Sequence, residues 1–137
     1  MVDYAAEFDA SFSRVTEPAT RDQFLTRFYE RFVAADALIV DKFRHTDMAH
    51  QKEMLRESLE VMRDFFLDHR SNPHLLTLAR IHGGRGRDIP PRLYLTWLDC
   101  VVATVHDVDP EVTPNVELAW RIVMAPGIEF MKFYRDR

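Results

Sequence analysis

The sequence is poor in cysteine, in long apolar stretches and in positive charge. Cys100 is the only cysteine among 137 residues, so no disulfide can form within the chain, and a reducing, cytoplasmic setting is expected. No apolar run approaches the roughly 20 residues that a membrane-spanning helix needs. The first residues carry acids in place of the basic segment of a signal peptide. The net charge of -4 argues against a general affinity for nucleic acid.

The apolar residues that are present repeat with the period of a helix along the whole chain. Only four glycines occur, and no useful stretch alternates apolar and polar residues as a strand would. The length and the absence of any linker predict one domain over residues 1–137. We therefore predict an all-α fold with six substantial helices and one short one. The substantial helices are expected at residues 3–16, from 20, 47–69, 73–82, 90–109 and from 113.

Two of these helices have recognisable starts. Thr20 and Gln23 have the spacing of a capping box, in which each side chain satisfies a backbone N–H of the other residue. Asp47 stands directly before the third substantial helix and is expected to cap it. Both signals predict where a helix begins without help from the rest of the chain.

A histidine ends one of the apolar helical stripes. Leu75, Leu78, Ala79 and His82 follow one another at i, i+3, i+4 and i+7, and two glycines stop the helix at once. An imidazole at the inner end of a short apolar helix is suited to hold a metal or cofactor from one side. A capped histidine in an ordinary core gives the same pattern, so the stripe alone leaves both interpretations open.

Three further residues stand out against their neighbours. Tyr29 brings a hydroxyl into the broad apolar face of the second helix, where a backbone carbonyl or a bound ligand would satisfy it. Phe43 stands alone between two charged residues and has to pack inward. Gln51 occupies an apolar stripe near the start of the third substantial helix, as a boundary residue or as a functional amide. The residues alone leave these alternatives open.

The order of these features resembles a bacterial single-domain globin of the haemoglobin-like and sensor-globin branch. The resemblance covers essentially the whole chain and depends on the register among several segments. These are FYERFVAAD, Phe43, TDMAHQKEML, the helix that ends in His82, IPPRLYLTWL and ELAW. Phe43 follows Tyr29 by fourteen residues, Gln51 follows Phe43 by eight, and His82 follows Gln51 by thirty-one.

The resemblance implies haem b (iron protoporphyrin IX) held in a globin-like helical sandwich. His82 is then the axial ligand of the iron, as the proximal histidine is in globins. Its other ring nitrogen is expected to donate to a backbone carbonyl of its own helix, for which Leu78 is the candidate. Phe43 is expected to pack flat on the porphyrin.

The opposite, distal face of the implied haem carries the residues that meet a gas. Tyr29 and Gln51 are expected to supply hydrogen-bond donors, and Leu55, one turn after Gln51, to press on this side. Each such bond contributes roughly 1–3 kcal/mol in a dry pocket, so two donors imply tight oxygen binding and slow release. An alternative in which His45 or His50 swings onto the iron stays open.

Other residues are expected around the rest of the ring. Tyr94 and Trp97 line the proximal wall. Arg85 and Arg87, together with Arg92, pair with the haem propionates, because guanidinium recognises carboxylate with two parallel bonds. The alternative for these arginines is a solvated basic loop.

The function that the resemblance implies is reversible binding of O2, NO or CO, for gas binding, transport, sensing or detoxification. Turnover of NO, or peroxidase-like activity, would need an outside reductant. Related flavohaemoglobins activate the proximal histidine through a Tyr–Glu pair; Tyr94 matches that Tyr, but Glu129 is a doubtful match for the Glu. The last two long helices often mediate self-association in globins, so a homodimer is one expected state. The alternatives are a haem-free signalling module of globin fold and a plain helical interaction protein.

Overall fold

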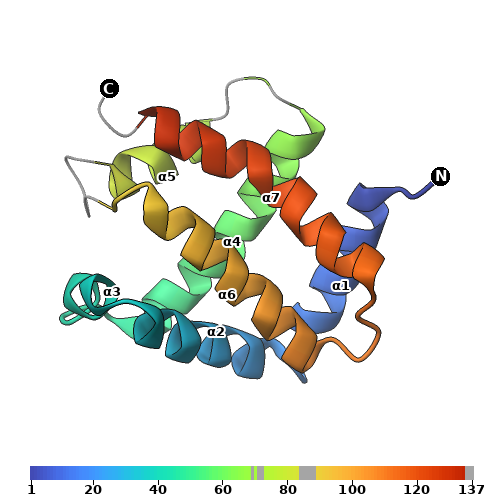
Figure 1. Ribbon diagram of the computed structural model, residues 1–137, viewed down its shortest axis with the longest axis horizontal. Helices are drawn as coiled ribbons and strands as arrows, with labels where there is room; N and C mark the ends of the chain where they lie inside the picture. The colour runs from blue at the N-terminus through green and yellow to red at the C-terminus, as the bar shows by residue number, and fades with distance from the viewer. Residues whose placement is uncertain (69, 71–72, 84–88, 135–137) are drawn as a thin grey trace.

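The computed structural model describes residues 1–68, 70, 73–83 and 89–134. Within these ranges the chain forms seven helices and no strand, so the all-α prediction is confirmed. None of the helices described is long and apolar enough to cross a membrane. The helices are α1 (Tyr4–Thr16), α2 (Arg21–Ala35), α3 (Ala37–Lys42), α4 (Met48–Leu67), α5 (Pro73–His82), α6 (Arg92–Val108) and α7 (Pro114–Tyr134) (Figure 1).

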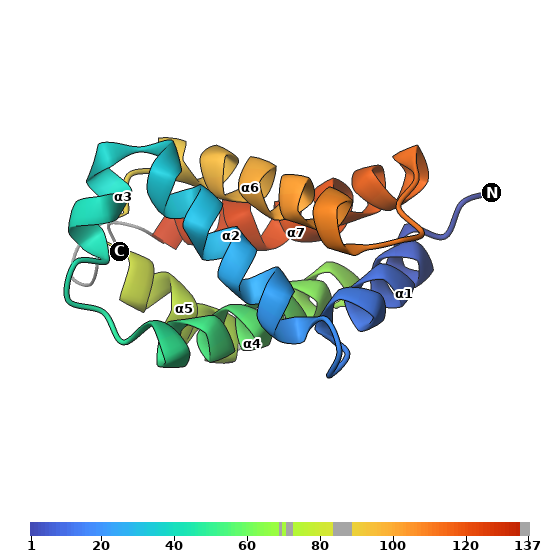
Figure 2. The same ribbon diagram turned by 90° about the horizontal axis from the view of Figure 1, so that it is seen from below.

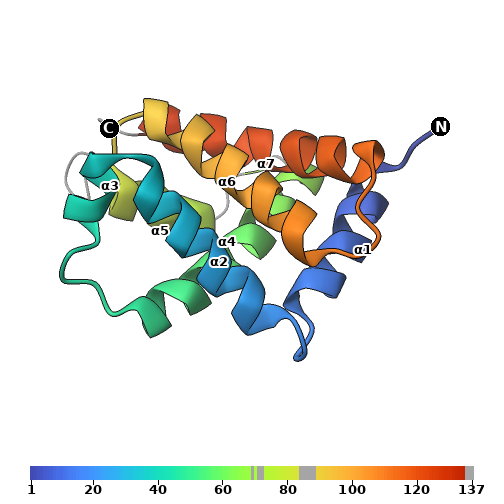
Figure 3. The same cartoon turned by 60° about the horizontal axis from the view of Figure 1, so that its bottom comes forward.

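The helices are stacked in two layers that cross each other. Figure 2 shows α6 and α7 in one layer and α4 and α5 in the other, with α2 running obliquely between them. Helix α7 packs on α1, α4 and α5, while α2 packs mainly on α6. Figure 3 shows α3 and α5 at one end of the molecule and α1 at the other end. The two ends differ in how they are filled.

The helix starts agree only in part with the local sequence signals. Asp47 caps α4 as predicted, because its carboxylate accepts a hydrogen bond from the backbone N–H of Ala49 at 3.1 Å. The predicted capping box of Thr20 and Gln23 is wrong, since no side chain caps the start of α2. The Thr20 hydroxyl donates instead to the backbone carbonyl of Arg14 at 2.7 Å. A contact across the corner between α1 and α2 thus replaces the local bond that the spacing indicates.

The end of the molecule that holds α1 is filled with aromatic rings. Trp120 of α7 is completely buried, and the centroid of its ring lies 4.6 Å from that of Phe8 in an edge-to-face arrangement. Phe24 of α2 lies 6.2 Å from the same ring. The indole N–H donates to the hydroxyl of Ser11 at 2.9 Å, so the polar atom of this buried ring is satisfied.

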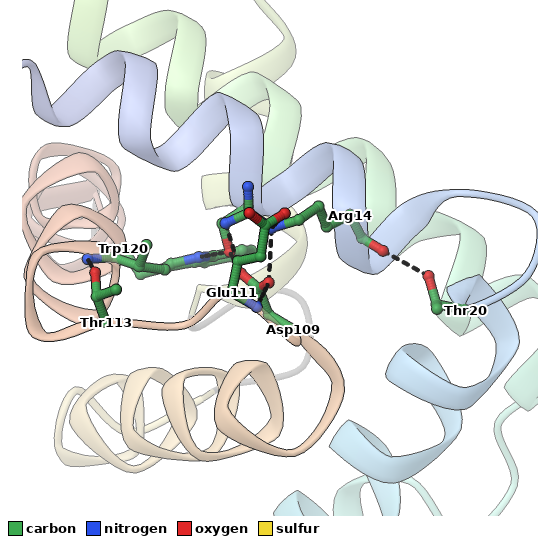
Figure 4. A network of polar contacts seen from close by, with 8 residues as sticks. Arg14, Thr20, Asp109, Glu111, Thr113 and Trp120 are labelled. Atoms are coloured by element: carbon green, nitrogen blue, oxygen red, sulfur yellow. Dashed lines mark hydrogen bonds and ion pairs between the residues drawn. The ribbon is translucent and has the colours of Figure 1, made fainter.

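A buried ion pair lies beside these rings (Figure 4). The Asp109 carboxylate, in the corner between α6 and α7, has no exposed surface and accepts hydrogen bonds from Arg14 Nε at 2.6 Å and from the Ser11 hydroxyl at 2.6 Å. Burial raises the pKa of Asp109, but the hydrogen bonds from Arg14, Ser11 and the Glu111 backbone outweigh it, and the pKa lies below its ordinary value. The charged carboxylate therefore fastens α1 to the α6–α7 corner.

The single cysteine is a small buried side chain. Cys100 lies on the inner side of α6, and only 6% of its surface is exposed. Burial raises the pKa of its thiol, an effect that the nearby positive charge of Arg31 only partly offsets.

Helices α4 and α7 approach closely at a glycine. A Cβ added at Gly127 would lie 2.8 Å from the Cγ and 3.1 Å from the Cβ of Met62. Helix α7 runs unbroken through this glycine and the proline before it. The absence of a side chain at residue 127 therefore lets the two helices meet.

The buried ion pair predicts a pH-dependent stability. Asp109→Asn keeps the shape of the side chain but leaves Arg14 with only the exposed Glu111 as a charged partner, and should lower the free energy of unfolding by about 3 kcal/mol at neutral pH. The folded-state pKa of Asp109 lies below 3.8, so its contribution is present above that pH and is lost as the pH falls through the folded-state pKa. Urea unfolding at neutral and acidic pH should show a difference between wild type and variant that narrows in acid.

Asp107→Asn is the matched control for this measurement. Asp107 pairs with Arg31 at 2.7 Å, but both side chains are more than one third exposed. Its removal should therefore change the free energy of unfolding by about 1 kcal/mol or less. A difference for Asp109→Asn that stayed constant from neutral to acidic pH would contradict the assigned role of its charge.

The close approach of α4 and α7 predicts that Gly127→Ala destabilises the fold. Overpacking a core costs about 1–3 kcal/mol, which exceeds the gain in helix propensity of about 1 kcal/mol. Thermal unfolding should show a lower midpoint for the variant. In a Met62→Ala background the same change should cost less, because the clashing atoms beyond Cβ are gone. An unchanged or higher midpoint for Gly127→Ala alone would show that the contact is not tight.

Candidate functional site

The end of the molecule that holds α3 and α5 is hollow. A cavity there encloses about 770 Å³ of space, counting the solvent at its mouth. With the exception of Arg92, every described residue that the sequence analysis assigns to the haem site lines this one cavity. These residues are Tyr29, Phe43, Gln51, Leu55, Leu78, His82, Tyr94 and Trp97. Arg85 and Arg87, which complete the predicted set, lie outside the described residues.

His82 lies at the C-terminal end of α5, where its helix presents it to the cavity. Its Nδ1 lies 2.8 Å from the backbone carbonyl oxygen of Leu78, one turn earlier, which is the contact predicted from the sequence. Because a carbonyl oxygen only accepts, Nδ1 carries the proton, and the lone pair of the neutral ring is on Nε2. The carbonyl of His82 itself accepts from the N–H of Ile89 at 3.0 Å, which fixes the end of the helix. Its role as a metal ligand stays a prediction.

Tyr29 and Gln51 come from α2 and α4 and are both buried. The Tyr29 hydroxyl donates to the backbone carbonyl of Gln51 at 3.2 Å. Of the two acceptors that the sequence left open for this hydroxyl, the structure thus shows the backbone carbonyl. Leu55, one turn after Gln51, is buried as well and lines the same wall. The predicted distal residues therefore share one face of the cavity.

Phe43 caps the C-terminus of the short helix α3. Its backbone N–H donates to the carbonyl of Ile39 at 3.1 Å, which turns the chain so that the ring faces inward. The ring lies edge-on to Tyr29 at 5.9 Å and to Phe32 at 6.3 Å between centroids. The inward packing that the isolated Phe predicts is therefore present, and it joins the cavity wall to the aromatic residues of α2.

The junction of α2 and α3 is held by a polar contact to α6. Arg92 Nη1 donates to the carboxylate of Asp36 at 2.6 Å, and this bond, with one from the backbone N–H of Leu38, holds the pKa of Asp36 below its ordinary value. Arg92, predicted to meet a propionate, thus pairs with Asp36 and does not line the cavity. Ala37, where many globins have proline, still begins a helix at this junction.

Helix α6 supplies part of the cavity wall. Tyr94 and Trp97 both line the cavity, and the Trp97 ring lies 6.2 Å from that of Phe28. Glu129, weighed as a partner for Tyr94, is exposed and pairs with Lys132 at 3.2 Å. This separates the two residues of the proposed Tyr–Glu pair.

Several cavity residues were not identified from the sequence. Met54, Ser58 and Met62 continue the α4 stripe of Gln51 and Leu55, so the helical period could have indicated them. Lys42 is the one Lys or Arg among the described residues that line the cavity. Ile89 and Met131 carry no local signal, because the fold alone brings them there.

His45 and His50, the alternative distal ligands, lie outside the cavity lining. Both side chains are exposed, His45 in the connection between α3 and α4 and His50 in the first turn of α4. Either would have to move inward to reach the cavity.

The crossed helical layers and the histidine-bearing cavity define a globin-type helical sandwich. The crystal structure of protein PA3967 from Pseudomonas aeruginosa PAO1, described as structurally highly homologous to a human haemoglobin, superposes with a TM-score of 0.89. It is 30% identical in sequence, and the match covers 98% of this chain and 100% of that one. No protein-family model matches the sequence, and a search of curated proteins gives no match. The chain belongs to the globins and is a bacterial single-domain globin.

Proposed function

We propose that this globin binds haem b in the cavity, with His82 as the axial ligand, and that it reversibly binds a diatomic gas. The observation that carries the proposal is that the imidazole of His82 lines the same cavity as the buried Tyr29 and Gln51. Haem held in this way supplies one open coordination position for O2, NO or CO. The haem-free alternative would fill this place with side chains or an acyl ligand, and the three polar residues Tyr29, Gln51 and His82 in the lining argue against it.

The chemistry of the cavity fits a flat, mostly apolar cofactor with acidic side groups. Its walls are dominated by apolar and aromatic side chains. The hydrogen bond from Nδ1 of His82 to the Leu78 carbonyl leaves Nε2 as the nitrogen that would bind a metal. Lys42, at the end of α3, offers a positive charge for a propionate. Arg85 and Arg87 remain proposed partners for the same groups.

The hydrogen bond of Tyr29 changes the expected strength of gas binding. A tyrosine hydroxyl has one proton, and here it is given to the carbonyl of Gln51. To donate to the gas, the hydroxyl must give up its bond to the carbonyl. Its net contribution is therefore the difference between the two bonds, about 1 kcal/mol. The amide of Gln51 is the second proposed donor. We therefore expect firm but readily reversible binding.

The proximal side favours ligand binding over peroxidase-like turnover. The Nδ1 proton of His82 goes to a neutral carbonyl, whereas a carboxylate partner would make the ring more basic. Glu129 is held at the surface by Lys132. We propose that the protein acts inside the cell in gas binding, transport or sensing, and that any detoxification of NO or O2 depends on an outside reductant.

The proposal predicts that His82 is required for haem. The wild-type protein, as purified or after addition of hemin, should show a strong Soret band that shifts with CO. His82→Gly should lose the band, and added imidazole should restore it by filling the space of the missing ring. Absorption spectra of the ferric, ferrous and CO forms measure this.

His106→Gly is the matched control, because His106 is an exposed residue that pairs with Glu117 away from the cavity. It should keep the full Soret band without imidazole. A colourless wild-type protein that takes up no hemin would refute the proposed function.

The hydroxyl of Tyr29 predicts a moderate effect on oxygen release. Tyr29→Phe removes a donor worth about 1 kcal/mol after exchange, so oxygen should leave roughly fivefold faster. Stopped-flow displacement of O2 by CO measures the rate. Tyr4→Phe, which removes a hydroxyl outside the cavity, should leave it unchanged. Equal release rates for wild type and Tyr29→Phe would show that the hydroxyl stays with Gln51 and does not serve the gas.

A further inference from the structure

A second hollow lies on the surface between α4 and α5, which run side by side in one layer (Figure 2). We call it the α4–α5 groove; it encloses about 500 Å³, counting open solvent. Its rim is formed by the exposed residues Glu57, His74 and Thr77. Farther in, Val61 and Ile81 are only partly exposed. The lining thus changes from polar to apolar with depth.

The inner end of the groove is the wall of the cavity. Met54, Ser58 and Leu78 line both hollows, so the same three side chains separate the groove from the proposed haem site. Met54 and Ser58 flank Leu55 on α4, and Leu78 precedes His82 by one turn on α5. A molecule that passed between them would arrive between the two faces of the cavity.

The hydroxyl groups along the groove donate hydrogen bonds to backbone carbonyls. Ser58 Oγ donates to the carbonyl of Met54 at 2.7 Å, and Thr77 Oγ1 donates to that of Pro73 at 3.0 Å. Their protons are thus turned towards their own helices. The side chains of Glu57 and His74 are at the solvent edge. Beyond the rim, the groove suits a small uncharged apolar molecule better than an ion.

We propose that the α4–α5 groove is an access path along which a diatomic gas reaches the cavity, with Met54 as the side chain that moves aside. This inference rests on the proposed function. Methionine is unbranched and flexible, and partly exposed side chains change rotamer within nanoseconds. The path therefore needs no movement of a helix.

A bulky side chain in the groove should close the path. Val61 lines the groove but not the cavity, so Val61→Trp obstructs the groove while leaving the haem contacts in place. An access path changes the free-energy barrier between free and bound O2 and leaves the free energies of these two states unchanged. Flash photolysis and stopped flow should therefore show O2 association and dissociation slowed by the same factor, about twofold or more, with unchanged affinity. Val61→Ala should speed both rates.

Leu118→Trp is the matched control, because it places the same side chain in a hollow between α6 and α7 that shares no lining residue with the cavity. It should leave both rates at their wild-type values. Association rates for Val61→Trp and Val61→Ala equal to that of wild type would overturn the path, and so would a changed affinity with unchanged association.

Xenon tests the groove without any haem chemistry. Apolar cavities bind xenon, so xenon pressure should shift the methyl resonances of Val61 and Ile81, which line the groove and not the cavity, in the protein as purified, and Val61→Trp should abolish the shift at Ile81. The absence of a shift in the wild-type protein would overturn the path. If the protein binds no haem but shows these shifts, the proposed function fails while the opening between α4 and α5 stands.

Discussion

The carboxylate of Asp109 is the contact on which the arrangement of the helices most depends. It is entirely buried, yet it is ionised and bonded to Arg14, Ser11 and the backbone of Glu111. The Ser11 hydroxyl also accepts a hydrogen bond from the indole N–H of Trp120. Since α1, α6 and α7 meet at this point, one end of the molecule is locked by charge-assisted bonds as well as by packing.

That locked end allows the other end to stay hollow. A cavity removes packing contacts that a core would otherwise make, and the elements around it have to be held by something else. Rings of α2 connect the two ends, from Phe24 beside Trp120 to Phe28 and Tyr29 at the cavity. The solid end positions the helices, and the hollow end presents their functional side chains.

Helical period and local spacing predicted most of the candidate site. The i, i+4 relation of Leu78 and His82 fixed both the placement of the imidazole and the acceptor of its proton, because both lie on one helix. Gln51 was identified as a polar residue in an apolar stripe, and it lines the cavity. Such signals depend only on residues within one helix, so the contacts between helices do not change them.

Contacts between distant segments could not be predicted in this way. The bond of Tyr29 to the Gln51 carbonyl joins two helices, and the bond of Ser11 to Asp109 joins residues 98 positions apart. The capping box at Thr20 failed for the same reason, since a carbonyl from the preceding helix competes for its hydroxyl. Ile89 and Met131 reach the cavity through the fold alone.

The buried thiol of Cys100 has a practical consequence for work with nitric oxide. S-nitrosothiol formation needs an accessible sulfur and is favoured by the thiolate, but this sulfur is enclosed by α6 and its neighbours and its pKa is raised. A nitric oxide signal from the folded protein is therefore not expected to come from the sulfur of Cys100.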